Sequence, residues 1–296
     1  MIEAVARRVT DGEKKKGHIP WRAWRARVFW KIRKLVEGRV EQLPAPARLP
    51  TKYPKCVIFV MDGNTRYAAL HGKDASWGHR EGVATARRIL EALEGRPVAG
   101  AGFWALSIDN FTGRQKSETA EICAHIKAQI LEWFDKPKQV RIRFCGSWSQ
   151  YAQDPDLDRL IAKIEHDTSK YSYRHLTIFL GYSGREDTRH MAIAVARDFV
   201  ASGRPMEDLE SVVTQEYIQD RLQTSHIDDE DLLIIRTGEL PGQAHTSDFV
   251  QWQLRGAEWK FTTTLWPAFT VEELDAILEE YGSRPQLKGK ARVERV

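Results

Sequence analysis

The sequence feature that most constrains the fold is a repeated alternation of short apolar runs with longer amphipathic segments. The first run, Cys56–Met61 (CVIFVM), is continuously apolar, which is typical of a strand buried on both faces. Repeated strand-then-helix units predict an α/β fold. We therefore expect a mostly parallel central sheet of about six strands, flanked by helices and built with right-handed crossovers.

The same pattern continues along the chain to about residue 281. The predicted strands cover 56–61, 98–108, 140–145, 176–180, 231–235 and 260–265, and the predicted helices cover 78–93, 117–134, 157–164, 186–200 and 270–281. The helices are assigned from apolar residues three or four positions apart, such as Ile122, Ile126 and Ile130, which we interpret first as core residues.

Charge divides the chain into two parts. Residues 1–50 hold 13 Lys and Arg against 5 Asp and Glu, whereas residues 51–296 hold 32 against 36. We therefore predict a basic N-terminal arm over 1–50 and a separate, larger domain over 51–296. Because the larger part is mildly acidic, nucleic acid is not an expected partner.

The arm contains a predicted amphipathic helix over Trp21–Val40, followed by a Pro-rich linker. Trp24, Val28 and Ile32 share one face, and seven Lys or Arg lie in the segment. Two interpretations stay open: the apolar face docks on the domain, or the helix makes a peripheral contact with a membrane surface.

Three absences set the expected compartment. No apolar stretch approaches the ~18 residues that a membrane-spanning helix needs. The first residues lack the apolar region of a secretory signal, and three widely spaced cysteines predict no disulfide framework. A cytoplasmic protein, with possible peripheral membrane contact, is expected.

Polar residues follow three of the predicted strands. In a parallel sheet, ligands bind beyond the carboxyl ends of the strands, so we expect these groups to converge in one cleft. The first group is Asp62-Gly63-Asn64-Thr65-Arg66-Tyr67, the second is Ser107, Asp109, Asn110 and Arg114, and the third is Arg236-Thr237-Gly238-Glu239 with His245-Thr246-Ser247-Asp248.

The first group has the chemistry of a phosphate and metal site. Asp62 offers a hard oxygen ligand for Mg²⁺, which usually binds one or two carboxylates together with substrate phosphates. Gly63 lets the backbone approach a ligand closely, although Asp-Gly-Asn is also a common turn sequence. Other site classes are not found: the sequence has no P-loop, no HExxH and no nucleophile elbow, and Gly100-Ala101-Gly102 lies inside a predicted strand.

A series of segments in a fixed order resembles the cis-prenyltransferases, the undecaprenyl and dehydrodolichyl diphosphate synthases. The segments are VIFVMDGNTRYAALHG, WGHREG, ALSIDNF, LLIIRTGE, SDFVQWQ, GAEWKF and LWPAF. The resemblance covers roughly Lys55 to Tyr281. It implies Mg²⁺-dependent condensation of isopentenyl diphosphate onto an allylic diphosphate, such as farnesyl or geranyl diphosphate, by a dimer, here expected to be a homodimer.

The resemblance also implies roles for individual residues. Asp62 matches the essential aspartate that holds Mg²⁺ and the allylic diphosphate, and Glu258 matches a second metal-linked carboxylate that reaches the partner subunit's site. His79 matches a residue linked to diphosphate departure or proton handling, and Asn110 one that helps remove the proton. The implied substrate-binding residues are Gly63, Asn64, Thr65, Arg66, Tyr67, Ser107, Asp109, Phe111, Arg114, Arg236, His245 and Ser247.

The sequence departs from the family pattern at several positions. Ala75 stands where an arginine usually meets the allylic diphosphate, and Asp109 where Glu is usual. The loop after Arg236 is longer than usual, and His245-Thr246-Ser247 replaces its R-x-S motif. An arginine would bind a phosphate more firmly than this histidine, which is charged only part of the time near neutral pH.

Two alternatives to chain elongation stay open at this point. The departures at Ala75 and His245 raise the possibility of a related enzyme that makes a branched or cyclised terpenoid diphosphate. A non-catalytic partner subunit is the other alternative, although such subunits usually lose the aspartate that is present here as Asp62.

Overall fold

The computed structural model describes residues 52–113, 116–134, 139–228 and 230–283. Within them, six strands form one sheet in the order β3-β4-β2-β1-β5-β6. Every pair of neighbouring strands is parallel, as the sequence predicted. The strands are β1 Cys56–Val60, β2 Gly100–Ser107, β3 Val140–Cys145, β4 Arg174–Tyr182, β5 Leu232–Arg236 and β6 Glu258–Phe261.

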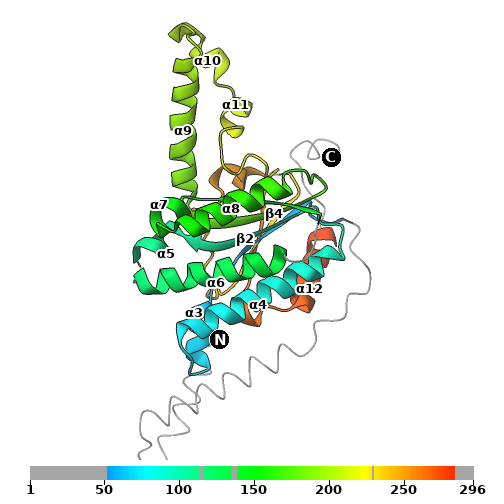
Figure 1. Ribbon diagram of the computed structural model, residues 1–296. Helices are drawn as coiled ribbons and strands as arrows, with labels where there is room; N and C mark the ends of the chain where they lie inside the picture. The colour runs from blue at the N-terminus through cyan, green and yellow to red at the C-terminus, as the bar shows by residue number, and fades with distance from the viewer. Residues whose placement is uncertain (1–51, 114–115, 135–138, 229, 284–296) are drawn as a thin grey trace, which may run out of the picture. The chain divides into compact units, whose positions relative to one another are not determined.

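One face of the sheet carries four long helices and the larger part of the core. These are α4 Ala75–Glu94, α6 Lys116–Phe134, α8 Pro155–Thr168 and α12 Val271–Ser283. Figure 1 shows α4, α6 and α8 lying across this face. Phe59, Phe103 and Trp266 meet at its centre, with ring centroids 5.2–6.2 Å apart. This apolar burial is the main force that fixes the helices on the sheet.

The helix starts follow local sequence signals. The Asp74 side chain accepts a hydrogen bond from Trp77 N at the start of α4, at 2.8 Å. At the start of α8, Asp154 accepts bonds from Asp156 N and Leu157 N, both at 3.1 Å, and Pro155 occupies the first turn. Such caps satisfy backbone donors that have no partner within the helix.

The other face is covered mainly by the chain between β4 and β6. Phe249 is fully buried there and packs against Trp104, Phe179 and Tyr182. Helix α9, Gly184–Ala201, starts at this face and extends away from the sheet beside α10 Leu209–Val212 and α11 Gln215–Gln219 (Figure 1). Asp187 ties its first turns to this face by accepting bonds from Tyr182 Oη and Thr224 Oγ1, both at 3.1 Å.

Some boundaries differ from the predicted ones. The last strand was predicted over 260–265, but β6 runs from Glu258 to Phe261. The chain then leaves the ladder, because Trp266 N donates to Asp62 O at 3.0 Å and draws residues 262–266 beneath the end of β1. Five short α-helices among the described residues were also not predicted: α3 Asn64–Leu70, α5 Ile108–Gly113, α7 Trp148–Ala152, α10 and α11.

The remaining expectations concern the N-terminal helix, membrane-spanning segments and the three cysteines. The predicted helix Trp21–Val40 lies outside the described residues. Among the described helices, none is both long and apolar enough to cross a membrane. Cys56, Cys123 and Cys145 are free thiols, and burial raises the pKa of Cys56 to about 12.

Candidate active site

A polar pocket of about 340 Å³ lies where β1, β2 and β5 end. Its position confirms that the polar groups after these strands converge, because parallel strands end at a common edge. Among the residues predicted from sequence, its lining contains Asp62, Gly63, Asn64, Thr65, Arg66, His79, Ser107, Asp109, Asn110, Arg236 and Ser247.

Asp62 lies between two arginines in this pocket. Its Oδ1 accepts a bond from Arg66 Nη2 at 2.9 Å, and its Oδ2 accepts one from Arg236 Nη2 at 3.2 Å. The Asp62 side chain is 41% exposed, whereas that of Arg236 is only 10% exposed. A carboxylate and two guanidinium groups thus meet at a surface that an anionic ligand can reach.

Arg236 is held on all sides by this chain. Nη1 donates to Ser247 Oγ at 2.9 Å, and Nε forms an ion pair with the buried carboxylate of Glu239. Glu239 also accepts from His245 Nδ1 at 3.2 Å. The pKa of Glu239 is lowered: burial alone raises it, but the hydrogen bond from His245 and the charge of Arg236 outweigh burial.

The loop that carries Asp62 is fixed by the loop after β5. Thr237 Oγ1 accepts from Asp62 N at 3.1 Å and lies 2.9 Å from Asp62 O. Gly238 has a φ of +70°, and a Cβ there would stand 2.8 Å from Asp62 O and 2.6 Å from Arg66 Nη2. Glycine is therefore required at this position for both conformation and space.

A reciprocal pair of hydrogen bonds orders the end of β2. Ser107 N donates to Asn110 Oδ1 at 3.2 Å, and Asn110 N donates to Ser107 Oγ at 3.1 Å. This pattern matches a helix capping arrangement and holds both side chains at the first turn of α5. Across the pocket, Asn64 Oδ1 is buried without a hydrogen-bond partner among the described residues.

The polar pocket adjoins an apolar cavity of about 90 Å³. The two share Met61, Asn64, His79 and Ala105 in their linings. Helices α4 and α6 supply most of the apolar wall, which is formed by Val83, Ala86, Phe103, Ile122, Ile126, Ile130, Ile178 and Trp266. The same three isoleucines that we interpreted as core residues therefore also face an internal space.

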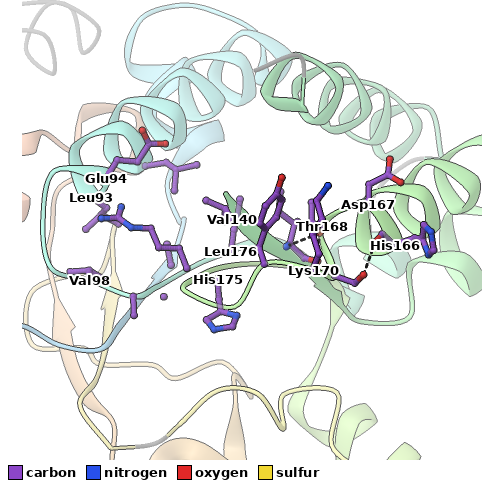
Figure 2. Close-up of a pocket in the computed structure, with 18 residues that line it drawn as sticks. Leu93, Glu94, Val98, Val140, His166, Asp167, Thr168, Lys170, His175 and Leu176 are labelled. Carbon is purple, nitrogen blue, oxygen red and sulfur yellow. Dashed lines mark hydrogen bonds between the residues drawn. The ribbon is translucent and has the colours of Figure 1, made fainter. Parts of the chain in front are cut away.

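A third cavity, of about 610 Å³, lies at the opposite edge of the sheet, where β2, β3 and β4 begin. Figure 2 shows Val140 and Leu176 at its centre and the side chains of Glu94, Asp167 and Lys170 around it. His175 points to the other side of its strand (Figure 2). Phe103 lines the apolar cavity and Ala101 lines this third cavity. The two residues are two positions apart on β2 and so lie on the same face of the sheet, which both cavities therefore share.

Several predicted residues lie outside the polar pocket. Tyr67 stacks on Trp77 at 5.6 Å, and Phe111 stacks on Tyr151 at 5.9 Å. The His245 side chain is 60% exposed and bonds to Glu239. Arg114 lies outside the described residues.

Glu258 lies far from Asp62 within one chain. Glu258 on β6 is paired in register with Leu233 on β5, whereas Asp62 N donates to Thr237 Oγ1. Thr237 follows the end of β5, four residues after Leu233. Four residues of extended chain span about 13 Å. The two carboxylates therefore do not meet within this chain.

The donor set fits Mg²⁺ that is held partly by substrate. Among the described residues, no cluster of three or more His, Cys, Asp or Glu side chains is placed to bind a metal ion. A complete protein cage is not needed, because Mg²⁺ usually takes one or two carboxylates and several oxygens from phosphate or water. Asp62, partly exposed and beside two arginines, is a suitable single ligand.

The described site agrees with the comparison to known protein families. A family model described as "Putative undecaprenyl diphosphate synthase" matches residues 60–289. The chain belongs to this family. The match includes the polar pocket and the three segments whose polar residues form it, so the sequence resemblance to cis-prenyltransferases is confirmed.

Individual relatives are moderately similar over most of their length. A ditrans,polycis-undecaprenyl-diphosphate synthase of Xanthomonas axonopodis pv. citri, described as specific for (2E,6E)-farnesyl diphosphate, is 32% identical over 81% of this chain and 90% of its own. An isoprenyl transferase of Geobacter sulfurreducens is 29% identical over 82% of this chain and 95% of its own. These cis-prenyltransferases match the described domain in extent.

A solved structure supports the fold. The lavandulyl diphosphate synthase of Lavandula x intermedia, in complex with dimethylallyl diphosphate, superposes with a TM-score of 0.69 at 24% identity, covering 79% of this chain and 97% of that one. At this identity the likeness concerns the fold alone.

Sequence reasoning missed two residues that organise this cis-prenyltransferase site. Thr237 and Glu239 stood in the third polar group but received no role. The signal was their position directly after a buried strand and beside Arg236. The sequence did not indicate that Thr237 would bond to the loop after β1, because that contact joins residues 175 positions apart.

Proposed function

We propose that the protein condenses isopentenyl diphosphate with an allylic prenyl diphosphate, such as farnesyl or geranyl diphosphate, to give a Z-polyprenyl diphosphate. One observation carries this proposal: a polar, arginine-bearing pocket opens beside an apolar cavity, with Asn64 and His79 at their boundary. An allylic diphosphate has the same two halves, an anionic head and an apolar chain. Family membership supports the same reaction.

The arginines act on the charged half of the substrates. When the allylic C–O bond breaks, its electron pair passes to the departing diphosphate, whose charge grows. Arg66, next to the loop Gly63-Asn64-Thr65, stabilises that charge on the allylic side, and Arg236 with Ser247 binds the isopentenyl diphosphate. Preorganised cations beside a developing negative charge lower the barrier because they need no reorganisation during the reaction.

When substrate is bound, Asp62 would exchange its two arginine partners for a metal ion. In the described state both its oxygens face arginines, which a bound diphosphate would engage instead. Asp62 is then the residue that would hold Mg²⁺, and the ion would supply further neutralisation of the diphosphate charge. The loops that fix Asp62 keep its carboxylate at the pocket edge while its partners change.

Carbon–carbon bond formation requires alignment and loss of one proton. The isopentenyl double bond attacks the allylic carbon, and a proton then leaves to set the new double bond. Asn110, fixed by Ser107, is the group proposed to assist that departure, and His79 lies at the boundary that the reacting carbons would occupy. Holding both substrates in line supplies roughly 7–11 kcal/mol in favourable cases.

The apolar cavity favours elongation over the two alternatives. A growing chain needs an apolar path away from the diphosphate site, and the wall from α4 and α6 offers one. The relatives above are named for prenyl transfer and polyprenyl synthesis, so a branching or cyclising reaction is not favoured. Asp62 is present, which argues against a non-catalytic partner subunit.

Dimer formation and membrane contact complete the proposal. A homodimer in which Glu258 serves the partner's site would account for a family carboxylate that lies far from Asp62 in its own chain. The basic arm over residues 1–50, joined to the catalytic domain over 51–296, would bring the enzyme to an anionic membrane that accepts its apolar product.

The test is a reaction with labelled isopentenyl diphosphate and each allylic diphosphate, with and without Mg²⁺, followed by mass spectrometry and NMR of the products. We expect linear Z-polyprenyl diphosphates that need Mg²⁺. Asp62→Asn, which keeps size and removes charge, should lower kcat at least ~100-fold without loss of folding. A folded wild-type protein that makes no prenyl product from any primer would refute the proposal, and branched products would restore the alternative.

A further inference from the structure

Glu239 is a buried acid at a site that must bind anions. Only 7% of the residue is exposed, and it stands directly behind Arg236, which lines the polar pocket. A negative charge here opposes the binding of a diphosphate. It also incurs a desolvation cost, because burial disfavours the charged form. Such a residue is retained at this cost only if its contacts are needed.

The contacts of Glu239 are with two nitrogen-bearing side chains, Arg236 at the end of β5 and His245 on the loop that follows it. Its Oε1 pairs with Arg236 Nε, and its Oε2 accepts from His245 Nδ1 at 3.2 Å. One carboxylate thus orients a guanidinium and an imidazole together. Because Arg236 Nε faces Glu239, its two Nη groups lie on the opposite side, where they meet Asp62 and Ser247 at the pocket.

The contact with Glu239 also orients the His245 imidazole. A carboxylate that accepts from Nδ1–H fixes the ring orientation and leaves Nε2 for a ligand. The charged groups behind His245 are Glu239 itself, then Arg236 on the same carboxylate, and Asp62 and Arg66 beyond it.

The loop that carries His245 has a defined backbone conformation and is fixed at its far end. Gly238 and Gly242 have φ of +70° and +80°, and Ser247 and Asp248 also have positive φ. Asp248 anchors the far end by accepting from Ser183 Oγ and from Arg185 N at 3.2 Å. His245 is therefore carried on a loop tied at both ends, with Glu239 as its described polar partner.

We propose that Glu239 is a positioning residue that orients Arg236 and His245 toward the diphosphate of isopentenyl diphosphate, so that a carboxylate-supported histidine does the work of a second arginine. This inference rests on the proposed function for the identity of the substrate. It implies that loss of the Glu239 charge weakens binding of this substrate and leaves binding of the allylic substrate unchanged.

Steady-state kinetics for each substrate, with the other substrate and Mg²⁺ saturating, test this proposal. We compare wild type with Glu239→Gln, which keeps the shape and loses the charge, and with Glu239→Asp, which keeps the charge on a shorter side chain. His245→Arg, whose guanidinium can replace the imidazole, should bind isopentenyl diphosphate at least as tightly as wild type.

Glu239→Gln should raise the KM for isopentenyl diphosphate about 10-fold, with little change in kcat or in the KM for the allylic substrate. Glu239→Asp should recover part of the loss. The proposal is overturned if Glu239→Gln leaves the KM for isopentenyl diphosphate unchanged, or if it changes both KM values equally.

Calorimetry with inorganic diphosphate separates this proposal from the proposed function. If wild type makes no prenyl product, the proposed function fails, yet diphosphate should still bind more weakly to Glu239→Gln and His245→Gln than to wild type. Equal diphosphate affinity in all three proteins would overturn the role of Glu239 whatever the activity. Because His245 is largely exposed, its variants are expected to fold normally.

Discussion

At the scale of single residues, Thr237 joins two loops of the site through one hydroxyl group. It is fully buried and bonds both the N–H of Asp62 and a carbonyl of the same loop. Replacing it by Val keeps the size but removes this acceptor from the partly buried Asp62 N–H, which then retains only Val60 O at 3.0 Å. We expect Thr237→Val to cost about 1–3 kcal/mol in the free energy of unfolding and to lower kcat/KM at least ~10-fold.

Thr237→Ser is the matched control, because it keeps the hydroxyl and loses only a methyl group. Urea unfolding and steady-state kinetics should place it near wild type in activity. Equal losses in the Ser and Val variants would mean that packing, rather than the hydroxyl, holds Asp62.

His226 makes stability depend on pH. It bonds Thr177 Oγ1 at 2.8 Å, and burial, with further contributions from Arg143 and His175, lowers its pKa to about 3. An unfolded histidine has a pKa near 6.5, so below that pH the unfolded chain binds more protons than the folded one. The stabilising contribution is present above about pH 6.5 and is lost as pH falls toward 3.

Urea unfolding at pH 7 and pH 4.5 measures this effect. We expect the wild-type free energy of unfolding to fall by roughly 2–3 kcal/mol more than that of His226→Gln over this interval. Gln can still bond Thr177 but does not titrate. Parallel losses in the two proteins would assign the acid sensitivity to other groups.

At the scale of elements, α4 lies unusually close to α3 because of two glycines one turn apart. A Cβ on Gly78 would stand 2.3 Å from Asn64 O, and one on Gly82 would stand 2.2 Å from Asn64 Oδ1. Trp266 Nε1 donates to Gly82 O at 2.7 Å and closes the other side. The place of Asn64 between the two cavities therefore depends on the absence of side chains on this helix face.

Gly82→Ala should displace Asn64, destabilise the protein by about 1–3 kcal/mol and raise the KM for the allylic substrate. Gly95→Ala, at the end of the same helix, is the control, since its Cβ would meet its nearest atom at 3.8 Å. Thermal unfolding and kinetics of both variants check this. A Gly82→Ala protein with wild-type stability and KM would contradict the close-packing argument.

At the scale of the whole molecule, the separation of Asp62 from Glu258 gives a test of the proposed homodimer. If each site takes Asp62 from one chain and Glu258 from the other, mixing Asp62→Asn with Glu258→Gln chains restores one intact site in every mixed dimer. Random pairing then recovers about a quarter of wild-type activity. Each variant alone should be nearly inactive.

The readout is the specific activity of the two variants co-expressed at equal levels and purified without selecting mixed dimers; selecting mixed dimers through two different tags should raise the recovery to about half of wild type. If both carboxylates served the same chain's site, no mixture would recover activity. Full activity of Glu258→Gln alone would remove this residue from the chemistry altogether.

The proposed membrane contact of the arm belongs to the same scale. Sedimentation with anionic liposomes at low salt should retain the full chain more than a chain starting near Leu49, because each basic residue near the surface adds about 1 kcal/mol. High salt should reduce the difference. Equal, negligible binding of both proteins would leave only the interpretation of a docked helix.

The sequence by itself determined the sheet, its long helices and the edge at which the site lies. Continuous apolar runs such as Cys56–Met61 and helical spacing such as Ile122–Ile130 are local signals of burial, and the rule for parallel sheets placed Asp62, Asn110 and Arg236 at one edge. The end of β6 was misplaced because a contact with Asp62, two hundred residues away, draws the chain off the ladder.

Only the tertiary structure decided how the site residues are held. Asp62 between two arginines, Thr237 bridging two loops and Glu239 joining Arg236 to His245 are contacts whose partners depend on loop conformation and on distant chain segments. Helix and strand periodicity reflect which residues are buried, a property that each segment carries in its own composition. Hydrogen-bond partners depend on where other segments lie after folding, and the sequence of a single segment does not specify those positions.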